Sequence, residues 1–211
     1  MIQVGGTFQP VHFVGVLAEG ALSSPTAGLR YNVGLGNGRG AIISRAGDAG
    51  DVNRNRAWVA KLFARPASLY GAEFGAAVYR DLVAIDKTPG FPEWISSAYV
   101  ALTREPEVIA EFSNVRHHDR VTLRDYDSQA FYVQVAARLP QAPLWKPYGR
   151  FEKILTDAGE PVLGNLTTSV ATLGTRYELS DSAALKAEYR HRRRPGEPPV
   201  NGLFLQAAFT F

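Results

Sequence analysis

The sequence predicts an all-β fold, an antiparallel up-and-down transmembrane β-barrel of about twelve strands, of which eleven are readable. Three observations lead to this prediction. Apolar and polar residues alternate with a period of two along most of the chain, and a helical period is almost absent. The connections between the expected strands alternate between short and long. The chain ends on an apolar strand whose last residue, Phe211, is aromatic.

Composition narrows the classes of protein that fit. A length of 211 residues suits one large all-β domain, so residues 1–211 are expected to form a single domain. The absence of Cys excludes disulfides and thiolate metal sites. The balance of 23 Lys and Arg against 20 Asp and Glu is too even to indicate a nucleic-acid partner. The sequence contains neither an apolar run long enough for a transmembrane helix nor a signal peptide.

The expected strands are 8–14 residues long, near or above the roughly 9–11 residues that a tilted strand needs to cross a bilayer. Each is rich in Val, Tyr, Phe, Leu and Ala at alternate positions, a composition typical of strands. In chain order they cover residues 11–20, 29–36, 57–65, 70–80, 94–103, 108–115, 130–139, 144–154, 166–179, 184–192 and 203–211.

The connections favour a barrel with two unlike ends. Five are short, at residues 21–28, 65–69, 104–107, 140–143 and 180–183. Five are long, at residues 37–56, 81–93, 116–129, 155–165 and 193–202. Outer-membrane barrels place short turns on the periplasmic side and long loops outside, whereas a soluble sandwich has no reason to sort its loops in this way.

The two faces of each strand also favour a membrane barrel. In strand 203–211 one face carries Leu203, Leu205 and Phe209, and the other carries Gln206 and Thr210. Alternation alone does not say which face points outward. All three Trp fall at the starts of strands, a position typical of the aromatic girdles at membrane interfaces. We therefore expect the apolar face to contact lipid and the charged face to line the interior.

The expected interior carries charges of both signs, with nine basic side chains against six acidic ones. This excess predicts a weak preference for anions in a pore whose selectivity depends on rings of side-chain charge. The expected pore-lining residues are Glu19, Arg30, Lys61, Arg65, Glu73, Glu111, Arg138, Arg150, Glu152, Arg176, Glu178, Lys186, Glu188, Arg190 and Arg192.

Three segments together resemble bacterial outer-membrane β-barrels of the porin type. They are LFLQAAFTF at the C-terminus, the hairpin TLGTRYELSDSAALKAEYRHR at 172–192, and WKPYGRFE at 145–152. The resemblance implies passive diffusion of small solutes through the outer membrane of a Gram-negative bacterium, with no enzyme activity, cofactor or metal, and the basic excess of the expected interior extends this to anionic solutes. It also implies that Phe209 and Phe211 belong to a signal read by the barrel-assembly machinery. The implied partners are outer-membrane lipid and lipopolysaccharide, and further copies of the chain in an oligomer.

The number of strands raises a question about the N-terminus. Bacterial single-chain barrels have an even number of strands, whereas eleven are readable here. If the last strand runs toward the periplasm, the first readable strand also starts outside. Either MIQVGG at 1–6 is the remnant of a further strand, which gives twelve, or N-terminal sequence is missing, or an oligomer completes the wall.

Other functions remain open from the sequence. One is a non-conducting structural or adhesive barrel whose long loops bind a partner. Another is a membrane-embedded lipid hydrolase, although no His stands at a convincing spacing from Ser96 or Ser97. The cluster RHHD at 116–119 has the chemistry of a metal or acid–base site, but a solvated loop is the expected reading. The run YRHRRRPGE at 189–197 is interpreted as rim charge, as a contact for anionic lipid headgroups or as an anion-attracting vestibule.

Overall fold

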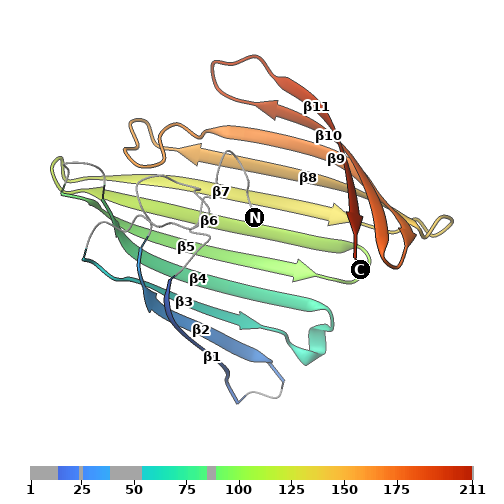
Figure 1. Cartoon of the computed structure of the whole chain (residues 1–211), viewed down its shortest axis with the longest axis horizontal. Helices are drawn as coiled ribbons and strands as arrows, with labels where there is room; N and C mark the ends of the chain where they lie inside the picture. Colours follow the sequence, from blue (N-terminus) through green and yellow to red (C-terminus); the bar gives the residue numbers. More distant parts are fainter. Residues whose placement is uncertain (1–13, 24–25, 39–53, 85–88, 211) are drawn as a thin grey trace.

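The computed structural model describes residues 14–23, 26–38, 54–84 and 89–210, which form one antiparallel sheet of eleven strands. Each strand pairs with the next in sequence, in the order β1 to β11 (Figure 1). The prediction of an all-β, up-and-down fold is therefore confirmed. The strands are β1 (Gly15–Ala21), β2 (Leu29–Gly36), β3 (Ala57–Ala64), β4 (Ala72–Val83), β5 (Phe91–Leu102), β6 (Glu107–Asp119), β7 (Arg124–Ala136), β8 (Trp145–Thr156), β9 (Thr168–Ser180), β10 (Ala183–Arg193) and β11 (Val200–Phe209).

Alternating β-branched, aromatic and small residues explain why these segments form long strands. From β4 to β10 each strand has 11–13 residues. The ladder between β9 and β10 has one register shift, at Ala183 and Ala184. A short 3-10 helix, η1 (Ala67–Leu69), lies between β3 and β4. Among the described residues no helix is long and apolar enough to cross a membrane.

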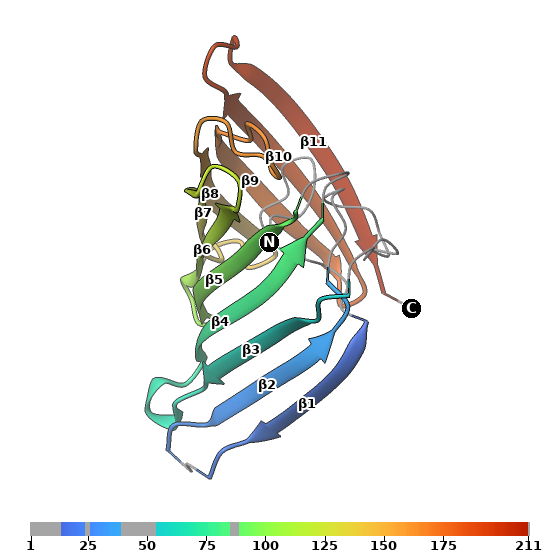
Figure 2. The same ribbon diagram turned by 90° about the vertical axis from the view of Figure 1, so that its left-hand side faces the viewer.

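The sheet is strongly curved and has two edges (Figure 2). Within the described residues β1 pairs with β2 alone and β11 with β10 alone. Because eleven strands alternate in direction, β1 and β11 run the same way. The expected twelfth strand at 1–6 lies outside the described residues, and so does Phe211.

One face of the sheet, here called the inner face, carries the buried residues. Its central cluster includes Tyr79, Val115 and Ile154 from three different strands, and Leu163 from the β8–β9 loop packs against them. Side chains from strands two apart also meet across this face, as they do on the concave side of a curved sheet; Tyr148 on β8 and Glu188 on β10 are one pair. The opposite, outer face is mostly exposed and apolar, and its exposed side chains include Leu62, Phe74, Val78, Phe112, Val133, Phe151, Leu173, Leu185, Leu203, Leu205 and Phe209.

The connections are less sorted by length than the sequence predicts. The prediction of a loop at 116–129 is wrong, because β6 continues to Asp119 and β7 begins at Arg124. Residues 84–90 and 194–199 are likewise shorter connections than expected. The polar residues of the segment 116–129 resemble a loop in sequence, but they lie in β6 and β7 and pair between these two strands. Arg116 on β6, for example, forms two hydrogen bonds with Asp127 on β7. Residues 157–167 form a long connection, whereas most of the loop expected at 37–56 lies outside the described residues.

Candidate functional site: the charged inner face

The alternation of the strands puts the expected pore-lining residues on the inner face or at its margin. Their neighbours at alternate positions, such as Tyr79, Ile154 and Ala184, are buried. Two of them, Arg65 and Arg138, lie just beyond the ends of β3 and β7. The others lie within strands: Glu19, Arg30, Lys61, Glu73, Glu111, Arg150, Glu152, Arg176, Glu178, Lys186, Glu188, Arg190 and Arg192. That they line a pore stays a prediction.

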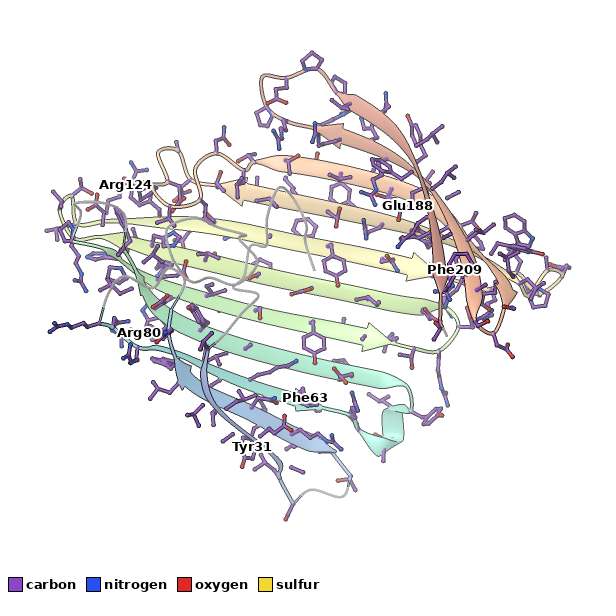
Figure 3. The ribbon with its side chains drawn as sticks, in the orientation of Figure 1. Tyr31, Phe63, Arg80, Arg124, Glu188 and Phe209 are labelled. Carbon is purple, nitrogen blue, oxygen red and sulfur yellow. The ribbon has the colours of Figure 1, made fainter. Side chains whose placement is uncertain are left out.

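Glu188 on β10 is the centre of one cluster of inner-face charges. Its carboxylate lies 2.6 Å from Nζ of Lys186 and accepts a hydrogen bond of 2.8 Å from Nε of Arg190. It also accepts a hydrogen bond from the hydroxyl of Tyr148, whose side chain reaches from β8 across β9. This reach requires Gly174 on β9, because a Cβ there would lie 2.4 Å from the Tyr148 ring. Figure 3 shows Glu188 among the side chains of the upper strands.

Glu73 on β4 is the centre of a second cluster, in which the tyrosine comes from the adjacent strand β5. Tyr99 donates its hydroxyl to Glu73 over 2.5 Å, and Nε of Arg65 donates to the same carboxylate over 2.5 Å. The Tyr99 ring lies over Gly75, where a Cβ would come within 2.2 Å of the ring. In both clusters a lysine stands above the tyrosine ring: Lys61 is 5.1 Å from the centre of the Tyr99 ring. Lys186 occupies the matching position, 5.2 Å from the centre of the Tyr148 ring.

Further ion pairs lie at the short-turn end of the sheet. Lys146 on β8 pairs with Glu107 on β6. Arg138, in the β7–β8 turn, binds Glu178 through two hydrogen bonds of 2.5 and 3.0 Å. The hydrogen-bonded carboxylate of Glu178 raises the pKa of the Arg138 guanidinium. Bidentate pairs of this kind are the better-defined surface ion pairs.

The structure adds charges to the inner face that the sequence analysis missed. Asp81, Glu93 and Glu160 are buried there, although all three fell in expected loops. Glu107 and Lys146 add one charge of each sign. Counted over the described residues, these four carboxylates and one lysine offset the excess of three basic side chains on which the expected anion preference depends. The sequence signal that could have revealed the two clusters is a glycine at an inner-face position of a strand, Gly75 or Gly174. Such a glycine often marks the close approach of another group, here a tyrosine ring of a neighbouring strand.

A buried group of three side chains lies at the other end of the inner face. Nε2 of His117 on β6 is 2.7 Å from Oε2 of Glu93 on β5, and its Nδ1 is 2.6 Å from Oε1 of Glu160. All three side chains have no exposed surface. The other oxygen of Glu160 accepts backbone N–H groups of Val162 and Gly164 over 3.1 and 2.9 Å, and that of Leu163. This carboxylate therefore holds the β8–β9 loop against the sheet.

The expectation that RHHD at 116–119 is a solvated loop is wrong for His117, which is buried within β6. His118 points to the opposite face, where its Nδ1 is 2.7 Å from Asp125. Among the described residues no group of His, Asp and Glu side chains has the arrangement of a metal site. The partners of His117 and His118 are carboxylates, and Ser96 and Ser97 alternate between the two faces of β5. Around His117 and His118 the arrangement supplies histidine–carboxylate pairs.

Aromatic residues lie on the outer face near both ends of the strands. Trp58 and Trp94 meet edge to face at the long-loop end, with 5.6 Å between ring centres. Trp145 and Tyr177 are 4.7 Å apart at the short-turn end. Phe209, one residue of the expected assembly signal, is exposed on this face. Figure 3 shows it at the opposite end of the sheet from Arg80 and Arg124.

Comparisons with protein-family models, with curated proteins and with solved structures give no match to this chain. The fold and the site together define an up-and-down antiparallel sheet with paired charges on its inner face and an apolar, largely exposed outer face.

Proposed function

We propose that this sheet is the wall of a porin-like channel in the bacterial outer membrane, through which small polar solutes diffuse. The observation that carries the proposal is the arrangement of the two faces. Leu203 and Leu205 on the outer face are 82% and 85% exposed, whereas Glu93 and His117 on the inner face are fully buried. Soluble monomers rarely leave apolar surface of this extent in water. A membrane barrel has this distribution, since its outer face meets lipid.

The inner face supports diffusion of polar solutes with little ion preference. Glu73, Glu107, Glu178 and Glu188 are each paired with Arg or Lys, and the acidic and basic side chains counted above for the described part of this face are equal in number. Side-chain charges set ion preference in a pore, so a balanced wall discriminates weakly. The partners of such a protein are outer-membrane lipid, lipopolysaccharide and the barrel-assembly machinery, with oligomers of the chain as a further form.

Closure of the wall would require the edges at β1 and β11 to be joined. These two strands run in the same direction, so a direct joint between them would be parallel. One additional strand of opposite direction between them would make twelve strands and keep every joint antiparallel. Even strand numbers of this kind are the rule in single-chain bacterial barrels.

A non-conducting barrel is the second candidate, because part of the inner face is filled. Glu160 and Leu163 from the β8–β9 loop are buried against strand residues, among them Val115 and Ile154. A loop held there narrows the interior at the long-loop end. In that case the barrel serves a structural or adhesive role.

Membrane extraction followed by bilayer recording tests both candidates. The protein should require detergent for extraction, and its gel mobility should change on heating, as expected for a stable membrane barrel. Reconstituted into a planar bilayer, it should then produce stepwise conductance with a reversal potential near zero in a salt gradient. Extraction without detergent would overturn the membrane proposal. Heat-modifiable mobility without conductance would favour the non-conducting barrel.

A further inference from the structure

A row of polar side chains crosses three strands on the outer face at the long-loop end. Lys153 on β8 is the register partner of Ser169 on β9, and Ser169 is the partner of Arg193 on β10. Neighbouring strands are about 4.8 Å apart, which puts the backbones of the two cations about 10 Å from each other. The row belongs to the polar end of this face, whereas nearer the middle the same strands carry Phe151, Leu173 and Leu185 there.

Side chains on the two last strands hold Arg193 in place. The hydroxyl of Tyr189 donates to Oδ1 of Asn201 over 2.9 Å, and Nδ1 of His191 is 2.7 Å from the same oxygen. Nε2 of His191 then accepts a hydrogen bond of 2.9 Å from Nε of Arg193. This chain of contacts occupies Nε alone and leaves the outer edge of the guanidinium, with its Nη groups, for another acceptor.

Neither cation of the row has a carboxylate partner within the described residues. The arginines that do form ion pairs there are others: Arg116 pairs with Asp127 on the outer face, Arg194 with Glu197 in the β10–β11 loop, and Arg65, Arg138, Arg150, Arg176 and Arg190 with carboxylates of the inner face. Arg80, another outer-face arginine at this end, stacks on Trp94 instead. An exposed arginine that is held by a histidine and left without a counter-charge is prepared for an external anion.

Apolar surface adjoins the row on the side toward the middle of the strands. Phe151 precedes Lys153 by two positions, and Leu173 follows Ser169 by four. Leu203 lies opposite Tyr189 on β11 and is largely exposed. Two cations above an apolar surface match a lipid whose anionic headgroup sits over its acyl chains.

We propose that Lys153, Ser169 and Arg193 bind the phosphorylated sugar headgroup of an outer-leaflet glycolipid, with its acyl chains against Phe151 and Leu173. The proposal rests on the membrane location given under Proposed function. Arg193 binds one phosphate through its planar guanidinium, and Lys153 binds a second as a point charge. Two separated cations fit a glycolipid with two phosphates better than a phospholipid with one. His191 acts as a positioning residue for Arg193.

Lipid titration of the purified full chain in detergent tests this site. The probes are lipid A with both phosphates, lipid A from which the phosphates have been removed, and phosphatidylglycerol, with bound lipid counted by native mass spectrometry. The double variant K153Q/R193Q should weaken binding of phosphorylated lipid A by about tenfold or more, the effect of losing charge-assisted hydrogen bonds. H191Q should weaken it less, since the charge remains while its support is lost. R80Q is the matched control and should bind as the wild type does.

The outcomes separate this inference from the proposed function. Equal binding of the three probes by the wild type would overturn it, as would unchanged binding by K153Q/R193Q or an equal loss in R80Q. Preference for phosphatidylglycerol would overturn the choice of glycolipid. Heat-modifiable mobility of every variant shows that the barrel has assembled. A wild type that lacks this property contradicts the proposed function itself, whereas an assembled barrel without lipid preference contradicts the glycolipid site alone.

Discussion

Nδ1 of His117 on β6 lies 2.6 Å from Oε1 of Glu160 in the β8–β9 loop, and neither side chain is exposed. The contact joins two segments more than forty positions apart in sequence. It anchors the loop on the inner face, since the same carboxylate also accepts three backbone N–H groups of the loop.

Glu160→Ala should release this loop. The substitution leaves three backbone N–H groups without their acceptor, and for the buried N–H of Leu163 this costs about 1–3 kcal/mol. We expect faster cleavage within residues 157–167 by limited proteolysis and, in the channel, a larger single-channel conductance. Glu197→Gln is the control, because Glu197 is an exposed loop carboxylate whose ion pair with Arg194 spans 3.8 Å. Unchanged proteolysis of the Glu160→Ala protein would contradict the anchoring role.

Gly174→Ala should destabilise the sheet around Glu188. The added Cβ would lie 2.4 Å from the Tyr148 ring, and the ring cannot shift without loosening its hydrogen bond to Glu188. Overpacking of this kind costs about 1–3 kcal/mol. Urea unfolding in lipid vesicles measures the change in the free energy of unfolding. Gly149→Ala is a matched control on the neighbouring strand, since its Cβ would meet only the Leu173 side chain at 3.8 Å. An equal loss of stability in both variants would rule out the Tyr148 clash as the cause.

Glu188→Gln should shift ion preference toward anions. The substitution removes the negative charge that faces Lys186 and Arg190 and leaves both cations on the inner face. The reversal potential in a potassium chloride gradient measures the shift. Lys186→Gln is the opposite change and should move the reversal potential toward cation preference. Shifts of the same sign in both variants would show that neither residue acts through its charge.

Much of the fold could be predicted from the sequence because a period of two is local information. The segment 184–192 appears as β10 (Ala183–Arg193), and the alternation of Leu185 and Lys186 between faces is as expected. The segment 116–119 could not be predicted, because Arg, His and Asp in a run resemble a solvated loop. What makes His117 a strand residue is Glu93 on β5 and Glu160 from a distant loop, and these pairings depend on the tertiary fold.

The two charge clusters were predicted only in part for a related reason. The sequence identifies Glu73, Lys61, Lys186 and Glu188 as inner-face residues, since strand alternation assigns them. It does not show that Tyr99 and Tyr148 bridge them, because that depends on glycines in neighbouring strands lying under the rings. Cross-strand register, rather than any local motif, creates these contacts.

The two edges of the sheet have a consequence for how such a wall enters lipid. Along β1 and β11 the backbone N–H and C=O groups that point away from the sheet have no strand beside them within the described residues. Water can satisfy these groups, but hydrocarbon cannot, and each one left without a partner there costs several kcal/mol. Summed along seven residues of β1 and ten of β11, this penalty would exceed the stability of an ordinary domain. If the sheet is the membrane wall proposed above, this edge penalty requires the seam to close before or during insertion, so that the wall enters lipid already sealed.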